Sequence, residues 1–398
     1  SGGTAAPAPR PAPGPGLVIP EQVTDPAQAP VRVVAQERPS HRIRLSAGVG
    51  IERGLQQLQL SFDYENIDLL GGASRLNWEN ELALRLLPSI VRPERVGPGG
   101  TTQLELTFPE VIRATDLALR GGIERELREA YSANILSARL GLPIHLRANA
   151  SLVPSVGARA WTGVSPVALG APVAPELSPD CPEPCRALLA EVELTIDGRD
   201  DPVWTRRGYL VFGAIEYLPP LASRFHALRL QPEVRGWVPA GDEVVFAGRL
   251  RLGAIFGLGA AVPVVLRYFD GGAGGHRGFG SEQLAPLLES AQGSIVPVGG
   301  AGTWLTSAEV RWRFSNAWGL VLFVDWGDVT AEPLSFDPAT APLAVGVGGR
   351  WYSLAGPVRA DFAWRPGERT RQALNTAAPA ERRAIDYFSF TLSLGEGF

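Results

Sequence analysis

The sequence predicts an all-β protein, a transmembrane antiparallel barrel of about sixteen strands. From residue 41 to the C-terminus, apolar and polar residues alternate over successive segments of about ten residues, a length that crosses a bilayer at a tilt. Strict alternation is typical of a strand with one apolar and one polar face. The polar face carries Arg and Glu freely, and 46 Gly and 35 Pro disfavour long helices.

Length and composition narrow the class further. The chain has 398 residues, of which 45% are hydrophobic and 20% charged, which suits one large domain or two ordinary ones and excludes a wholly disordered chain. No stretch of about 18 apolar residues is present, so we expect no helical membrane span. A net charge of −4 disfavours a nucleic-acid partner.

Two regions differ sharply in composition. Residues 1–40 form a Pro-rich segment whose run at 6–16 is typical of an extended linker without a packing surface. Residues 41–398 are the predicted barrel. In its first strand, alternate residues are apolar, namely Ile43, Leu45, Ala47, Val49 and Ile51. Further strands are expected to begin near residues 55, 76, 101, 116, 131, 144, 187, 207, 225, 243, 303, 318, 343, 357 and 385.

A soluble sandwich and a membrane barrel both use such strands. The strand length and the charged polar face favour the membrane, because a packed core does not tolerate unpaired charges. Aromatic residues also lie near strand ends, as in the interfacial girdles of membrane barrels, at Trp304, Phe314, Trp318, Trp326, Trp351 and Trp364. We therefore expect outer-membrane lipids around the apolar face.

The connections predict an orientation. The long ones, at 88–100, 155–186, 257–302, 329–342 and 366–384, mostly follow odd-numbered strands. Bacterial outer-membrane barrels place long loops outside and short turns in the periplasm, so we expect a Gram-negative outer membrane and a periplasmic N-terminus.

The only two cysteines, Cys181 and Cys185, then lie on an external loop. A disulfide between them is predicted, and two free thiols are the alternative. Two such ligands are too few for zinc without distant help, and we expect no metal and no cofactor.

The most informative loop is 257–302, which contains Gly274-Gly-His-Arg-Gly-Phe-Gly280. Alternation places Glu309 and Asp325 on the polar face of the two strands that follow. An Arg on a loop that folds into the lumen can meet both carboxylates in a charge-assisted fork. The alternative is a scatter of unrelated pore-lining charges.

Together these residues resemble the barrel of the BamA/TamA family of outer-membrane assembly proteins (bacterial surface antigen type). The resemblance covers residues 41–398 and extends to four further stretches, which are Asp200-Asp-Pro-Val-Trp-Thr-Arg-Arg-Gly-Tyr209, Gly346-Val-Gly-Gly-Arg-Trp351, Gly356-Pro-Val-Arg-Ala-Asp-Phe362 and Leu394-Gly-Glu-Gly-Phe398. It implies that Arg277-Gly278-Phe279 plugs the barrel through contacts with Glu309 and Asp325. It also implies a non-enzymatic insertion or translocation barrel whose clients are nascent outer-membrane proteins.

Family members normally carry periplasmic POTRA domains before the barrel, and forty residues cannot hold one. Either those domains were removed from this chain, or a POTRA-bearing or other periplasmic partner performs their work. The alternative function is a passive channel or a structural scaffold that has lost insertase activity. An outer-membrane hydrolase has little support, because no cluster of Ser, His and acidic residues stands out.

The family mechanism requires a weak seam between the first and last strands. Glycines that weaken strand pairing stand on both sides of that seam. The predicted seam residues are Gly48, Gly50, Gly395, Gly397 and the terminal Phe398. The alternative is that these glycines only relieve curvature where the barrel closes.

Overall fold

The structure is a computed structural model, and residues 40–398 form one compact unit within it. It describes residues 39–87, 93, 95–165, 184–222, 226–259, 261–289, 295–353, 356–366 and 387–394. The Pro-rich segment before residue 39 lies outside these ranges, so its assignment as a separate periplasmic segment stays a prediction.

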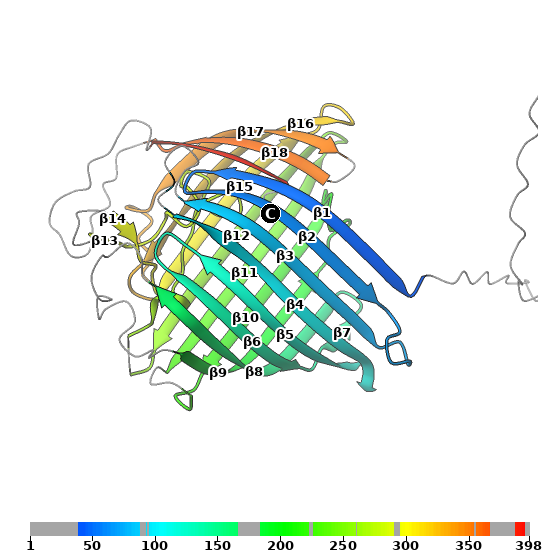
Figure 1. The fold of residues 1–398 in the computed structure, drawn as a ribbon. Coiled ribbons are helices and arrows are strands. Elements are labelled where there is room, and N and C mark those ends of the chain that lie inside the picture. Colours follow the sequence, from blue (N-terminus) through cyan, green and yellow to red (C-terminus); the bar gives the residue numbers. More distant parts are fainter. Residues whose placement is uncertain are drawn as a thin grey trace, which may run out of the picture. The chain divides into compact units, whose positions relative to one another are not determined.

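One antiparallel sheet of 17 strands closes on itself, because β1 pairs with both β2 and β19 (Figure 1). Its first strands are β1 (His41–Glu52), β2 (Leu55–Asn66), β3 (Arg75–Leu87), β4 (Arg95–Ile112), β5 (Thr115–Leu127), β6 (Ser132–Gly141), β7 (Ile144–Arg147), β8 (Ala150–Ser165) and β9 (Cys185–Asp197). The others are β10 (Gly208–Leu218), β11 (Ala227–Ala240), β12 (Val244–Gly257), β15 (Gly302–Trp312), β16 (Trp318–Thr330), β17 (Leu343–Ser353), β18 (Gly356–Trp364) and β19 (Phe388–Leu394).

The short strand β7 continues β6 after a break at Leu142 and Pro143, since both strands pair with β5 and β8. Counting β6 and β7 as one interrupted strand leaves sixteen strands around the barrel, which confirms the predicted fold class. The break forms where Pro143 has no N–H to donate to a neighbouring strand.

Two boundaries predicted around this break were wrong. The seventh barrel strand was expected near residue 144 but is β8, which begins at Ala150. β8 also continues to Ser165, ten residues into the connection predicted at 155–186. Over these residues β8 stays paired with β9, from Ser155 with Glu191 to Trp161 with Cys185.

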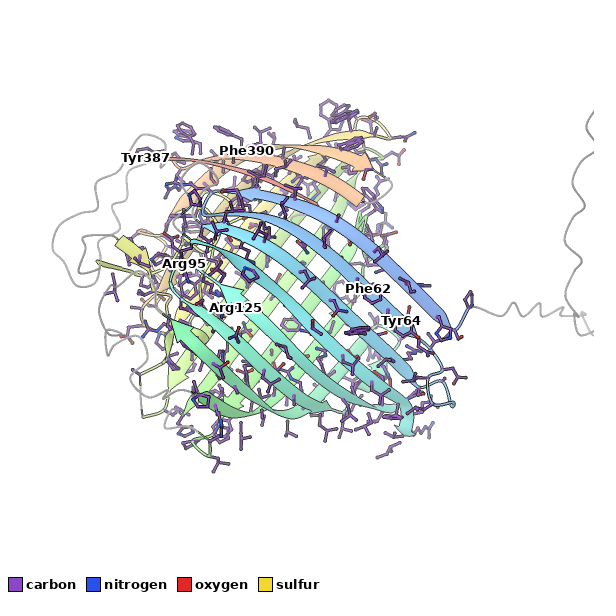
Figure 2. The ribbon with its side chains drawn as sticks, in the orientation of Figure 1. Phe62, Tyr64, Arg95, Arg125, Tyr387 and Phe390 are labelled. Atoms are coloured by element: carbon purple, nitrogen blue, oxygen red, sulfur yellow. The ribbon has the colours of Figure 1, made fainter. Side chains whose placement is uncertain are left out.

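The outer surface is apolar and the inner surface charged. Apolar side chains project outward from every part of the barrel wall, among them Phe62 and Phe390 (Figure 2). Aromatic residues pair near the strand ends, where Trp318 stacks on Trp351 with ring centres 6.3 Å apart. Trp304 is an exception to the exposed girdle, because Trp326 and Phe336 cover it.

The inner surface keeps its charges by pairing them across strands. Arg139 on β6 lies 2.6 Å from Glu191 on β9, and Arg249 on β12 lies 2.8 Å from Glu233 on β11. This arrangement explains why the polar face of the sequence contains arginine and glutamate at so many strand positions.

The described part of the connection between β12 and β15, residues 258–301, packs against the inside of the barrel wall, and we call this connection the inward loop. It contains a 3-10 turn η2 (Val264–Leu266) and a small hairpin of β13 (Leu287–Glu289) and β14 (Ile295–Pro297). Its apolar side chains pack against the inner wall in one buried cluster that includes Tyr131, Trp161, Val264, Leu266, Leu284, Ala285 and Val298. The main core of the protein therefore lies between this loop and the wall.

Within the described residues, no helix is long and apolar enough to cross a membrane.

The described residues of the first and last strands pair over a short length. Among the described residues, β1 and β19 pair only at Ile51 with Leu392 and at Glu52 with Thr391. On its other side β1 pairs with β2 along its whole length, from His41 to Glu52. The described part of β19 thus leaves most of the β1 edge unpaired.

Candidate functional site

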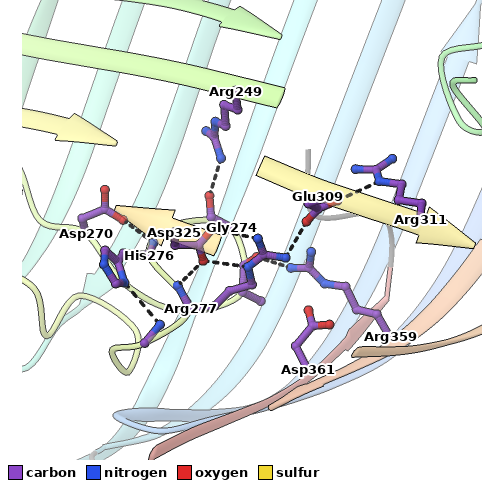
Figure 3. A network of polar contacts seen from close by, with 12 residues as sticks. Arg249, Asp270, Gly274, His276, Arg277, Glu309, Arg311, Asp325, Arg359 and Asp361 are labelled. Atoms are coloured by element: carbon purple, nitrogen blue, oxygen red, sulfur yellow. Dashed lines mark hydrogen bonds and ion pairs between the residues drawn. The ribbon is translucent and has the colours of Figure 1, made fainter. Parts of the chain in front are cut away.

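Arg277 of the inward loop lies between two carboxylates inside the barrel (Figure 3). Its Nε and Nη2 donate to the two oxygens of Asp325 at 2.8 and 2.7 Å, and its backbone N–H donates to the same carboxylate at 2.9 Å. Its Nη1 donates to Glu309 at 2.5 Å. Burial lowers the pKa of Arg277, but the two carboxylates outweigh burial and raise that pKa above its ordinary value. The guanidinium therefore stays charged and fixes the loop.

The two carboxylates come from neighbouring strands. Glu309 on β15 and Asp325 on β16 both point inward and are 3% and 0% exposed. The β15–β16 ladder pairs Ser307 with Asp325, so Glu309 lies two residues further along the same inner face. Arg311 donates through Nε to the second oxygen of Glu309 at 2.7 Å, which balances that charge.

Gly278 and Phe279 are also buried in the site. A Cβ at Gly278 would lie 2.6 Å from the Cβ of Ala344, so no larger residue fits without displacement of β17 or the loop. The ring of Phe279 contacts His276 edge-to-face at 5.1 Å and lies under the guanidinium of Arg365 at 4.1 Å. The structure thus places all three residues of the Arg-Gly-Phe motif against the inner wall.

His276 is fully buried beside this motif. Its Nε2 lies 3.1 Å from the backbone oxygen of Pro342, and its Nδ1 accepts the N–H of Gly278 at 3.3 Å. These partners require a neutral imidazole with its proton on Nε2. Burial lowers the pKa of His276 below its ordinary value, although Asp325 opposes the shift.

Sequence reasoning missed the residues that shape the loop before Arg277. Asp270 accepts N–H groups from Gly271 at 2.6 Å and His276 at 3.0 Å, and Arg251 of β12 donates to its other oxygen at 2.5 Å. Arg249, also on β12, donates to the backbone oxygen of Gly274 at 2.8 Å. The available signal was the pair of arginines two residues apart on the polar face of the strand that leads into the loop.

The predicted seam residues fall into two groups. Gly48 and Gly50 lie on β1 and face Gln59 and Gln57 of β2. The nearest atom to a Cβ at Gly48 would be 4.0 Å away, so close packing does not require glycine there. The remaining seam residues, Gly395, Gly397 and Phe398, lie outside the described residues.

Only one residue of the predicted cysteine pair is among the described residues. Cys185 is the first residue of β9 and is buried, whereas Cys181 lies outside the described residues. Their pairing stays a prediction. In the described part of the chain, no group of three or more His, Cys, Asp or Glu is placed to hold a metal ion.

A match to a protein-family model shows the family to which this barrel belongs. The model of the Omp85 superfamily domain matches residues 161–398, more than half of the chain. The chain belongs to the Omp85 superfamily. The matched region contains β9 to β19, the inward loop and the residues that hold it.

Two solved structures resemble the barrel. BamA from Haemophilus ducreyi, crystallised without POTRA domains 1–3, matches with a TM-score of 0.67 and 18% identity over 90% of this chain and 71% of that one. CdiB from Acinetobacter baumannii matches with a TM-score of 0.55 and 13% identity over 90% of this chain and 60% of that one. At such identities the similarity shows the fold alone.

Proposed function

We propose that this chain is an outer-membrane protein insertion or translocation barrel and the membrane subunit of a larger complex. The observation that carries the proposal is the limited strand pairing at the barrel closure, where, of the described residues, β19 pairs with β1 only at residues 51 and 52. No other described residue of β19 pairs with the β1 edge, and an incoming client strand adds to that edge by β-augmentation. Membership of the Omp85 superfamily supports the same function.

The inward loop is the plug of this barrel. Arg277 holds it through two buried carboxylates, which keeps the lumen closed in the resting barrel. The long connections define the external end and the short turns the periplasmic end, with the N-terminus in the periplasm of a Gram-negative cell. A periplasmic or POTRA-bearing subunit delivers nascent outer-membrane proteins to the seam.

A reversible lock on the seam tests the proposal. Ile51 and Leu392 face each other across β1 and β19, so cysteines at both positions form a disulfide on oxidation. Both native cysteines are replaced by serine in this variant. The complex is purified through a tag from gently solubilised outer membranes and placed in liposomes, and insertion of an unfolded small barrel is followed by its heat-modifiable gel migration.

Oxidation of the Ile51→Cys, Leu392→Cys variant is expected to abolish accelerated insertion, and reduction to restore it. The matched control has cysteines in place of Leu60 on β2 and Leu82 on β3. These two positions also face each other but lie away from the seam. This control is expected to insert clients normally in both states. A locked seam that still accelerates insertion contradicts the seam mechanism. A wild-type complex without any acceleration favours the passive channel or scaffold instead.

A further inference from the structure

A single residue of the inward loop, Ala273, is hydrogen-bonded to both sides of the barrel closure. Its backbone N–H donates to Oε2 of Glu52 at 3.1 Å, at the end of β1. Its backbone oxygen accepts a hydrogen bond from Nη2 of Arg359 on β18, the strand beside β19. Ala273 is buried, and so is Arg359, so water competes little for either bond.

The loop lies unusually close to the β1–β2 turn around this residue. The N–H of Ser281 donates to the backbone oxygen of Arg53 at 2.7 Å. A Cβ at Gly272, which has a φ of +78°, would overlap the Glu52 carboxylate, and a Cβ at Gly280 would overlap the Arg53 carbonyl. Glycine is therefore required at both positions for the loop backbone to reach the turn.

Among the described residues, strand pairing at the same place is limited. The described β19 meets β1 at two residue pairs, and one of them contains Glu52 itself. On the β19 side, the hydroxyl of Ser389 lies 3.5 Å from the backbone oxygen of Phe279 in the same loop. The loop segment 272–281 thus contacts both strands of the closure from inside the barrel.

We propose that Glu52 and Arg359 are positioning residues that hold the seam closed by clamping Ala273 between them. This inference deepens the proposed function, because it couples the loop to the strand edge that a client would use. Release of the inward loop would remove the clamp and free the β1 edge. The barrel then has two mutually exclusive states. In one the inward loop is seated and the seam is closed, and in the other the loop is released and the seam is open.

The test measures the seam width directly. Spin labels are attached at Leu58 on β2 and Phe362 on β18, two outward-facing residues on either side of the seam, in a variant whose native cysteines are serine. Electron–electron resonance on the reconstituted full chain gives the distance distribution. For Glu52→Ala we expect the main distance to lengthen by on the order of one strand spacing, about 5 Å.

Three further variants sharpen the result. Glu52→Gln retains an acceptor oxygen for Ala273, so its distance distribution is expected to match the wild type. Glu65→Ala removes a half-buried carboxylate at the opposite end of the same strand pair, where it contacts Arg42 at 3.4 Å, and serves as the matched control. Arg359→Ala also removes the hydrogen bond from its Nε to the hydroxyl of Ser393 on β19, at 2.6 Å. It is expected to widen the seam at least as much as Glu52→Ala does, and the double variant no further than Arg359→Ala, because both changes break the link through Ala273.

An unchanged distance in Glu52→Ala, or equal widening in Glu65→Ala, overturns the clamp. Additive widening in the double variant also overturns it, since that result requires two independent contacts. These readouts do not depend on client insertion. If the seam widens as expected but the chain never accelerates client insertion, the proposed function is contradicted and the clamp is still supported.

Discussion

The guanidinium carbon of Arg277 lies 3.6 Å from the centre of the Phe323 ring. Phe323 faces Glu309 directly across the β15–β16 ladder and lies two residues before Asp325 on the same inner face. The cation is therefore stacked on an aromatic ring while the two carboxylates bind its edges. Such an arrangement favours arginine over lysine, because a compact ammonium cannot stack and fork at once.

The two carboxylates are expected to differ in importance. Asp325 accepts three hydrogen bonds from Arg277, whereas Glu309 accepts one and is also bound by Arg311. Asp325→Asn should destabilise the seated loop by about 3–5 kcal/mol, the usual cost of breaking a buried ion pair, and Glu309→Gln by clearly less. Amide hydrogen exchange over residues 270–284 measures the difference. Equal exchange in the two variants would refute this ranking.

Gly278 is expected to tolerate no side chain. Gly278→Ala places a methyl group against Ala344 and should cost about 1–3 kcal/mol of loop stability through overpacking. Gly274→Ala is the control in the same loop, because a Cβ there would have no neighbour within 4 Å. Limited proteolysis of folded protein compares them. The prediction fails if both variants are cleaved at the wild-type rate.

The seating of the loop should weaken in acid. The pKa of buried His276 is lowered in the folded protein, so its contribution to stability is complete above the unfolded value of about 6.5. As the pH falls below that value, stability is lost at up to about 1.4 kcal/mol per unit until the folded pKa is passed. Amide hydrogen exchange over residues 270–284, compared at pH 7.5 and pH 5.5, tests this loss of loop stability.

His276→Gln should flatten that pH dependence, since its amide can replace both hydrogen bonds without titrating. His145→Gln is the control, because His145 is exposed and contacts Asp116 near the short turn at the opposite end of the barrel. Retained pH dependence in His276→Gln would assign the effect to another group.

The strands and the directions of their side chains could be predicted because successive side chains of a strand point to opposite faces of the sheet. Once β15 and β16 were recognised, Glu309 and Asp325 could only point inward. The same rule could not locate the break at Leu142 and Pro143, where one barrel strand is divided and the next begins later than expected.

The conformation of the inward loop could not be derived from the alternation of apolar and polar residues. The meeting of Arg277 with its carboxylates was expected from a family resemblance, whereas the structure shows its physical basis in the contacts of Asp270 and Arg251. Those contacts join residues on different elements, and alternation carries no information about them. The Ala273 contacts with Glu52 are more remote still, since 221 residues separate the two.

The conductance of single channels in planar bilayers tests most directly the claim that Arg277 locks a plug in the lumen. Wild-type protein is expected to show low open conductance, and Arg277→Ala a several-fold increase, because the loop loses both of its buried ion pairs with the wall and Asp325 is left without its cation. Arg42→Ala, which removes an exposed arginine 3.4 Å from Glu65 at the barrel edge, should behave as wild type. A wild-type channel that already conducts freely, with no response to Arg277→Ala, would contradict the plug.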